Sequence, residues 1–230
     1  MTWSGFTVEG GSLIEGLVGF VLAIGTIIVG TWVAMVAYHG YKRSENPSAL
    51  FLAAGIALTS AGYTGTRILV PTTGGSSLLT DAVASAVQFA GLVLVLYAVY
   101  GRPERRTRYV LGGTFIGAGL LALVPFVLVE VFGMTLSAGT TGANGPTAVL
   151  GAFITIQALR GYSRYGNRSM RWLAIGIALL TFVPFLVLEL LTLFRSTLAI
   201  SDARGLSLVL FTELVGVLAI LLSLQIDEQR

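Results

Sequence analysis

Long apolar segments constrain the fold of this chain of 230 residues more than any other feature. A helix needs about 20 apolar residues to cross the hydrocarbon core of a bilayer. Six segments approach that length: Leu13–Tyr38, Ala49–Val70, Asp81–Tyr100, Tyr109–Phe132, Arg171–Phe194 and Leu206–Gln225. A shorter one, Thr147–Leu159, reaches a tolerable span when it is extended back through Pro146. The sequence predicts an all-α integral membrane protein of seven transmembrane helices.

Composition supports this interpretation. Hydrophobic residues make up 55% of the chain and charged residues only 11%, against about 25% charged residues in soluble domains. We therefore expect a single membrane domain over residues 1–230, located in the cell membrane. The first twelve residues hold Glu9 and no Lys or Arg, unlike the basic start of a cleaved signal peptide. The first apolar segment should accordingly remain as a helix.

Basic residues predict the orientation of these helices. They concentrate in the connections after the first, third and fifth segments, and the positive-inside rule places those connections in the cytoplasm. The N-terminus is then outside and the C-terminus cytoplasmic. The pI of 9.4 reports this topology, and we expect no nucleic-acid partner. One basic cluster should bind anionic lipid head groups at the cytoplasmic leaflet; it comprises Arg102, Arg105, Arg106 and Arg108.

An internal repeat divides the chain. A shift of 121 positions lays Gly40–Leu58 on Gly161–Leu179 with 11 of 19 residues identical. The same shift aligns Asp81 with Asp202. These matches predict two parallel copies, about 13–100 and 146–225, joined by a linking helix at about 109–132. The fold class is thus a seven-helix bundle with a 3+1+3 parallel repeat.

Two prolines share a second motif, because Val124–Glu130 is similar to Val183–Glu189. Pro125 and Pro184 lie in mid-span, where each leaves the carbonyl four residues earlier without its N–H partner. We expect both helices to kink there.

The turn Ala37–Arg43 and the helix start Leu52–Gly55 resemble small three-helix membrane proteins of unknown function from halophilic archaea. This resemblance implies an archaeal source and a duplicated unit, and it transfers no activity. The 3+1+3 layout is similar to SWEET-type sugar transporters in architecture only. Seven helices with an external N-terminus also resemble microbial rhodopsins. The one lysine, Lys42, lies in a predicted loop, so a retinal Schiff base on the seventh helix is excluded.

Ionisable residues within a span are costly and often mark functional sites. Here they gather toward the outer side, and the predicted binding site for a substrate or ion comprises Glu213, Gln88, Glu189, Glu130 and Arg67. Glu213 lies deepest and would form the floor of an outward vestibule as a proton or cation site, with Arg67 as its counter-charge. Alternatively, Glu130, Glu189, Arg67 and Glu15 are interfacial residues whose side chains extend to water.

Other polar residues have simpler interpretations. Asp81, Asp202, Asn46 and Asn167 stand at predicted helix starts, where such side chains cap free N–H groups. His39 is the only histidine and the chain has no cysteine, so we expect no haem ligation and no metal site.

The leading hypothesis is a transporter or permeation-type protein that binds a small solute or ion near Glu213. One alternative is a sensor or receptor-like module that signals through a cytoplasmic partner, and another is a structural or assembly subunit. An enzyme is not expected, because no nucleophile with a base, metal-ligand spacing or phosphate loop is present. Membrane lipids are expected partners, and the sequence leaves open a homo-oligomer or a membrane partner protein.

Overall fold

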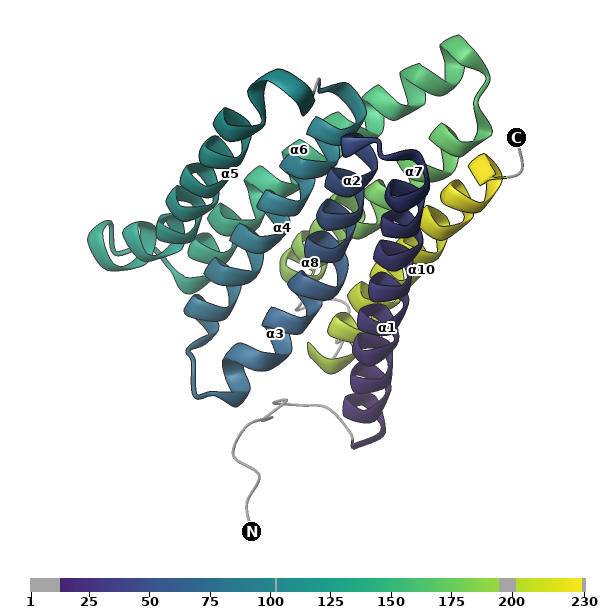
Figure 1. Ribbon diagram of the computed structural model, residues 1–230. Helices are drawn as coiled ribbons and strands as arrows, with labels where there is room; N and C mark the ends of the chain where they lie inside the picture. Colours follow the sequence, from purple (N-terminus) through teal and green to yellow (C-terminus); the bar gives the residue numbers. More distant parts are fainter. Residues whose placement is uncertain (1–12, 102, 195–201, 229–230) are drawn as a thin grey trace.

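Helices account for nearly all of the computed structural model, which describes residues 13–101, 103–194 and 202–228. The chain passes seven times between the two ends of one bundle (Figure 1). The first four passes are α1 (Leu13–Ser44), α2 to α3 (Pro47–Ala57, η1 Leu58–Gly62, Tyr63–Thr72), α4 (Ser77–Tyr100) and α5 (Pro103–Phe126) with η2 (Val127–Val131). The other three are α6 (Leu136–Tyr165), α7 with α8 (Arg168–Leu180, Phe182–Leu193) and α10 (Asp202–Glu228).

Within the described residues, six helical stretches are long and apolar enough to cross a membrane: Ile14–Ser44, Pro47–Thr72, Ser77–Tyr100, Thr107–Val131, Arg168–Leu191 and Arg204–Gln225. The all-α class and seven helices are confirmed, and the fold is compatible with a polytopic helical membrane protein. The remaining helix, α6, has 30 residues and is not among the six. That α6 is a span therefore stays a prediction.

Two boundaries differ from the sequence expectations. The uncharged stretch 133–145, which lies between the predicted helices 109–132 and 146–159, is mostly helical. There α6 begins at Leu136, and the Thr135 side chain accepts a hydrogen bond from the Ala138 N–H. Asp81 is not a helix cap, since α4 begins at Ser77 and the Ser76 hydroxyl oxygen accepts from the Leu79 N–H. The capping role of the Asp202 side chain lies outside the described residues.

The two predicted asparagine caps are confirmed, and they are alike. The Asn46 side chain accepts a 3.0 Å hydrogen bond from the Ser48 N–H, and the Asn167 side chain accepts a 3.1 Å bond from the Ser169 N–H. Both asparagines have extended backbone angles, which let their side chains turn back over the first helical turn. The residues in each pair lie 121 positions apart in the sequence.

Glycines bring helices into close contact at two similar crossings. A Cβ built on Gly55 of α2 would lie 2.7 Å from the Gly91 carbonyl oxygen on α4. A Cβ on Gly176 of α7 would lie 2.8 Å from the Gly216 carbonyl oxygen on α10. Only a residue without a side chain permits this approach. The hydrophobic core lies across these crossings and includes Val33, Ile56, Leu92, Ile154, Leu180, Val217 and Ile220.

In the described part of the chain, three helical passes are interrupted, two of them beside the prolines that the sequence predicted to kink. The second pass contains the π-helical turn η1, and the sixth pass is broken at Thr181, between α7 and α8. Pro184 comes three residues after that break. Pro125 precedes a second π-helical turn, η2. Because a π-helical turn holds an extra residue, it rotates the next side chains about the helix axis and changes the direction in which they point.

Candidate functional site

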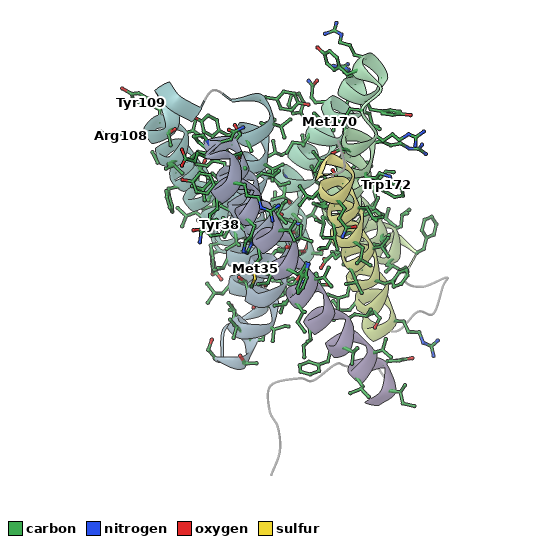
Figure 2. The ribbon with its side chains drawn as sticks, turned by 45° about the vertical axis from the view of Figure 1, so that its right-hand side comes forward. Met35, Tyr38, Arg108, Tyr109, Met170 and Trp172 are labelled. Atoms are coloured by element: carbon green, nitrogen blue, oxygen red, sulfur yellow. The ribbon has the colours of Figure 1, made fainter. Side chains whose placement is uncertain are left out.

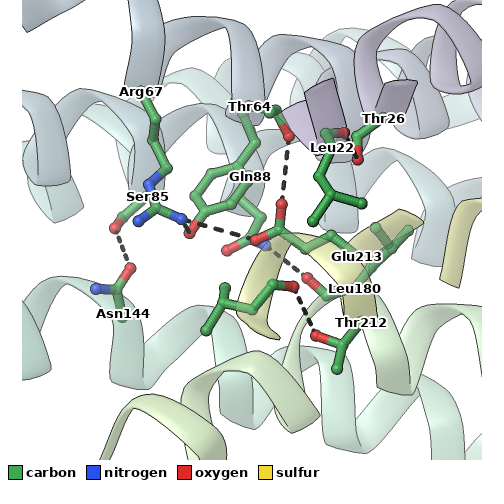
Figure 3. A network of polar contacts seen from close by, with 12 residues as sticks. Leu22, Thr26, Thr64, Arg67, Ser85, Gln88, Asn144, Leu180, Thr212 and Glu213 are labelled. Carbon is green, nitrogen blue, oxygen red and sulfur yellow. Dashed lines mark hydrogen bonds and ion pairs between the residues drawn. The ribbon is translucent and has the colours of Figure 1, made fainter. Parts of the chain in front are cut away.

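Glu213 is the most deeply buried acidic side chain in the described part of the chain, with an exposed fraction of 1%. It projects from α10 toward α3, where two residues approach it (Figure 3). The Thr64 hydroxyl donates a 3.4 Å hydrogen bond to Glu213 Oε2, and Arg67 Nη1 lies 3.7 Å from Glu213 Oε1. Thr64 and Arg67 share one face of α3 because they are three residues apart.

Arg67 is held by a second set of contacts. Its Nη1 donates a 3.4 Å hydrogen bond to the Tyr63 hydroxyl, and the guanidinium carbon lies 5.5 Å from the centre of the Tyr63 ring. Asp81 on α4 is close enough for its charge to act on Arg67. The side chain keeps an exposed fraction of 25%. Arg67 is therefore paired with Glu213 and lies within electrostatic range of Asp81, at the boundary between the buried network and the outside.

The pairing of Glu213 is loose. The 3.7 Å separation from Arg67 exceeds the 2.7–2.9 Å of a charge-assisted hydrogen bond, and Glu213 Oε1 has no hydrogen-bond partner among the described residues. A buried carboxylate requires pairing or hydrogen bonds to offset its lost hydration. The network thus has an unused acceptor, which a proton, a water molecule or a ligand could engage.

The Gln88 side chain bonds to the backbone of a neighbouring helix. Its exposed fraction is 4%, and its side-chain Nε2 donates a 3.0 Å hydrogen bond to the Leu180 carbonyl oxygen (Figure 3). Pro184, four residues after Leu180, has no N–H to offer that oxygen. Gln88 therefore satisfies the carbonyl that the proline leaves without its helical partner. The sequence predicted Gln88 only as a member of the binding site and did not reveal this backbone contact.

The other predicted site residues lie apart from Glu213. Glu189 on α8 accepts a 2.7 Å hydrogen bond from the Thr141 hydroxyl on α6. Glu130 lies in η2 and is exposed. Glu15 on α1 forms a 2.5 Å ion pair with Arg204 on α10, a partner that sequence reasoning had not assigned. The structure thus brings Arg67 to Glu213, while Gln88 bonds to the Leu180 backbone and Glu189 to Thr141 instead.

A cavity of about 100 Å³ lies between α1, α3 and α10, at the end of the bundle where α1 and α10 begin. Thr64 and Arg67, the two residues that contact Glu213, form part of its wall, and Glu15 lines it as well. The remaining lining residues are Gly16, Gly19, Phe20, Ala23, Ile68, Leu206 and Leu210. Glu213 does not line the cavity, so a molecule in it would reach Glu213 through Thr64 and Arg67.

The opposite end of the bundle carries the basic residues. Figure 2 shows Arg108 and Tyr109 there, and both are exposed. The side chains of Arg102, Arg105 and Arg106, the other members of the predicted lipid cluster, lie outside the described residues. His39 is exposed near the same end, and its Nδ1 lies 2.7 Å from the Met35 carbonyl oxygen. Among the described residues, no three His, Asp or Glu side chains are grouped so as to hold a metal ion.

Comparison with known proteins places this architecture in a family. No curated protein and no solved structure matches the chain. A family model matches residues 19–100 and 140–225, about three quarters of the sequence in two regions. This confirms the expected relationship to a duplicated family without assigned activity, while the archaeal source and the likeness to SWEET-type transporters or rhodopsins stay predictions. The chain therefore belongs to a family of unknown function, DUF7521.

Proposed function

We propose that this protein is a transporter or permeation-type membrane protein, and that the pair formed by Glu213 and Arg67 is its binding site for a proton or a small solute. The observation that carries the proposal is a fully buried carboxyl group whose loosely held cation lines a cavity. The contacts of Glu213 with Thr64 and Arg67, at 3.4 and 3.7 Å, are longer than ordinary hydrogen bonds. The long contacts to Glu213 suit a partner that changes during a cycle.

The proposal includes two parallel repeats of three helices each, one before α5 and one after it. Gly30 packs on Ser60 as Gly151 packs on Thr181, and the hydroxyls of Ser60 and Thr181 bond the carbonyls of Ile56 and Ile177. All these residues are related by 121 positions. Parallel repeats rotating about a shared site are a common basis for transport.

A different offset relates the third helix of each repeat. The crossing of Gly55 with Gly91 corresponds to that of Gly176 with Gly216, and Gly91 and Gly216 are 125 positions apart. In the proposal, a four-residue insertion before α10 accounts for this shift, and this register replaces the alignment of Asp81 with Asp202. The second region matched by the family is also four residues longer than the first. By this register Gln88 corresponds to Glu213, so one repeat carries a neutral amide where the other carries an acid.

In this proposal, the basic residues at one end of the bundle determine the orientation of the protein in the membrane. Lys42, Arg108, Arg160 and Arg171 all lie at the end opposite the cavity. If that end faces the cytoplasm, as the positive-inside rule requires, then the cavity opens to the exterior.

Proton flux into proteoliposomes tests this function. The full-length protein, reconstituted around a pH-sensitive dye, should dissipate an imposed pH gradient faster than empty liposomes do. Glu213→Gln should lower that flux at least tenfold, because an amide cannot take up the proton. Glu130→Gln is the matched control and should leave the flux unchanged, since Glu130 is exposed and outside the network. Equal flux for wild type and Glu213→Gln would refute the role of Glu213.

A further inference from the structure

The cavity beside Arg67 has the chemistry of a site for a small amphipathic anion. Phe20, Ala23, Ile68 and Leu210 supply apolar walls, and the Arg67 guanidinium is the cationic group that lines it. An engineered apolar cavity of about 150 Å³ binds benzene. By that scale, this cavity of about 100 Å³ accommodates a ligand of about four or five heavy atoms.

The Arg67 guanidinium has hydrogen-bond donors that are not used within the described structure. Its two contacts in the described structure, to the Tyr63 hydroxyl and to Glu213, both involve Nη1. The Nε–H and Nη2 groups have no hydrogen-bond partner among the described residues. A guanidinium presents its donors as a planar fork that fits a carboxylate with two parallel hydrogen bonds. The arginine is therefore able to bind a carboxylate ligand if its local charge is not already neutralised.

The charges around Arg67 determine when it is available. Glu213 faces it from α10 and Asp81 from α4, and Tyr63 lies beside it on α3. Glu15 of α1 also lines the cavity, but its carboxylate is paired with Arg204. Farther away, Glu189 of α8 is bonded to Thr141. With Glu213 ionised, two carboxylates surround one guanidinium and repel an anion. Protonation of Glu213 removes one of those charges and leaves the guanidinium less fully paired.

We propose that this cavity binds a small monocarboxylate with an apolar body, and that the ligand replaces Glu213 as the partner of Arg67 when Glu213 takes up a proton. The inference rests on the proposed function and names its substrate class. One proton adds to the Glu213 carboxylate, giving a neutral acid that remains beside the Thr64 hydroxyl. One carboxylate anion then pairs with Arg67. The two charges cancel, so each cycle moves one proton with one anion.

The cavity also offers a variant that blocks the ligand and leaves the charged residues in place. A Cβ on Gly16 would meet no atom within 4 Å, and Gly16 lines the cavity. A leucine at this position should extend into the empty volume without displacing a neighbour. Gly16→Leu should therefore fold, keep the pair of Arg67 with Glu213 and exclude the ligand.

Binding of radiolabelled propionate to the full-length protein in nanodiscs, measured at pH 6 and pH 8, tests the proposal. Propionate is ionised at both values, and empty nanodiscs correct for partition into lipid. Wild type should bind propionate at least tenfold more tightly at pH 6 than at pH 8. Glu213→Gln should bind with the same high affinity at both, while Arg67→Gln and Gly16→Leu should lose binding. An excess of the neutral analogue propionamide should compete poorly.

Other outcomes separate this inference from the function on which it rests. If propionate does not bind wild type but proton flux still depends on Glu213, the substrate class is wrong and the proposed function stands. Propionate binding that survives in Arg67→Gln, or that is equal at pH 6 and pH 8 in wild type, would overturn the exchange of partners at Arg67. Melting temperatures of all the variants identify any that have lost their fold.

Discussion

Replacing Gln88 by leucine should destabilise the protein because it strands the carbonyl that Pro184 leaves without a partner. Leucine is close to glutamine in size, so the substitution removes the 3.0 Å hydrogen bond to the Leu180 oxygen with little change in packing. Leaving a buried acceptor unsatisfied costs about 1–3 kcal/mol in soluble proteins. Polar contacts between membrane helices average about 0.6 kcal/mol, with a maximum of about 1.7.

We therefore expect Gln88→Leu to lower the free energy of unfolding by about 1 kcal/mol, which is about a fivefold change in the unfolding equilibrium constant. Unfolding in mixed micelles by added SDS, followed by tryptophan fluorescence, measures this change. Gln157→Leu on α6 is the matched control. Gln157 is only half-buried, and the described part of the chain shows no hydrogen bond from its side chain.

A double-mutant cycle isolates the contribution of the hydrogen bond between Gln88 and the Leu180 carbonyl. Pro184→Ala supplies an N–H that can bond to Leu180 within the helix, so Gln88→Leu should cost less in that background than in wild type. The coupling should approach the whole effect of the single substitution. If Gln88→Leu costs the same in both backgrounds, then the hydrogen bond to Leu180 is not the reason for its effect.

Two further predictions concern packing and lipid. Gly176→Ala should destabilise the bundle by about 1–3 kcal/mol, because its Cβ would lie 2.8 Å from the Gly216 carbonyl oxygen; Gly65→Ala, where a Cβ meets nothing within 4 Å, should be neutral or slightly stabilising in the same SDS titration. Each arginine of the basic cluster should strengthen the interaction with an anionic bilayer by about 1 kcal/mol relative to a neutral one. Equal melting temperatures in the two lipids would refute a lipid-binding role for the cluster. The control is a variant in which glutamine replaces Arg102, Arg105, Arg106 and Arg108 together, and its melting temperature should be the same in both lipids.

Depth along a helix was predictable from the sequence. Counting residues from the ends of each apolar segment placed Glu213 well inside its helix, and the structure buries it. The same counting brought Arg67 within reach of Glu213. Local capping was also predictable at Asn46 and Asn167, because it depends only on residues adjacent in sequence.

The direction in which a side chain points around its helix axis was not predictable from the sequence. Glu130 and Glu189 occupy the same position in two similar motifs, yet Glu130 is exposed in η2 and Glu189 bonds to Thr141. Glu130 lies inside the π-helical turn η2, whose extra residue changes the direction of the side chains, and sequence periodicity does not reveal where such a turn occurs. Contacts through the backbone, such as the one from Gln88 to Leu180, are equally invisible in the pattern of side chains.

The polar first half of α6 has a consequence for how the protein enters the membrane. Residues Leu136–Pro146 include several Gly and Thr residues and Asn144, and two of their side chains depend on other helices. Asn144 accepts a 2.7 Å hydrogen bond from Ser85 on α4, and Thr141 donates to Glu189 on α8. Since α8 is synthesised after α6, this segment leaves the ribosome before one of its partners exists. If α6 spans the membrane as the sequence predicts, we expect it to complete its insertion only when α8 arrives, so that α6 and α8 insert together rather than one by one.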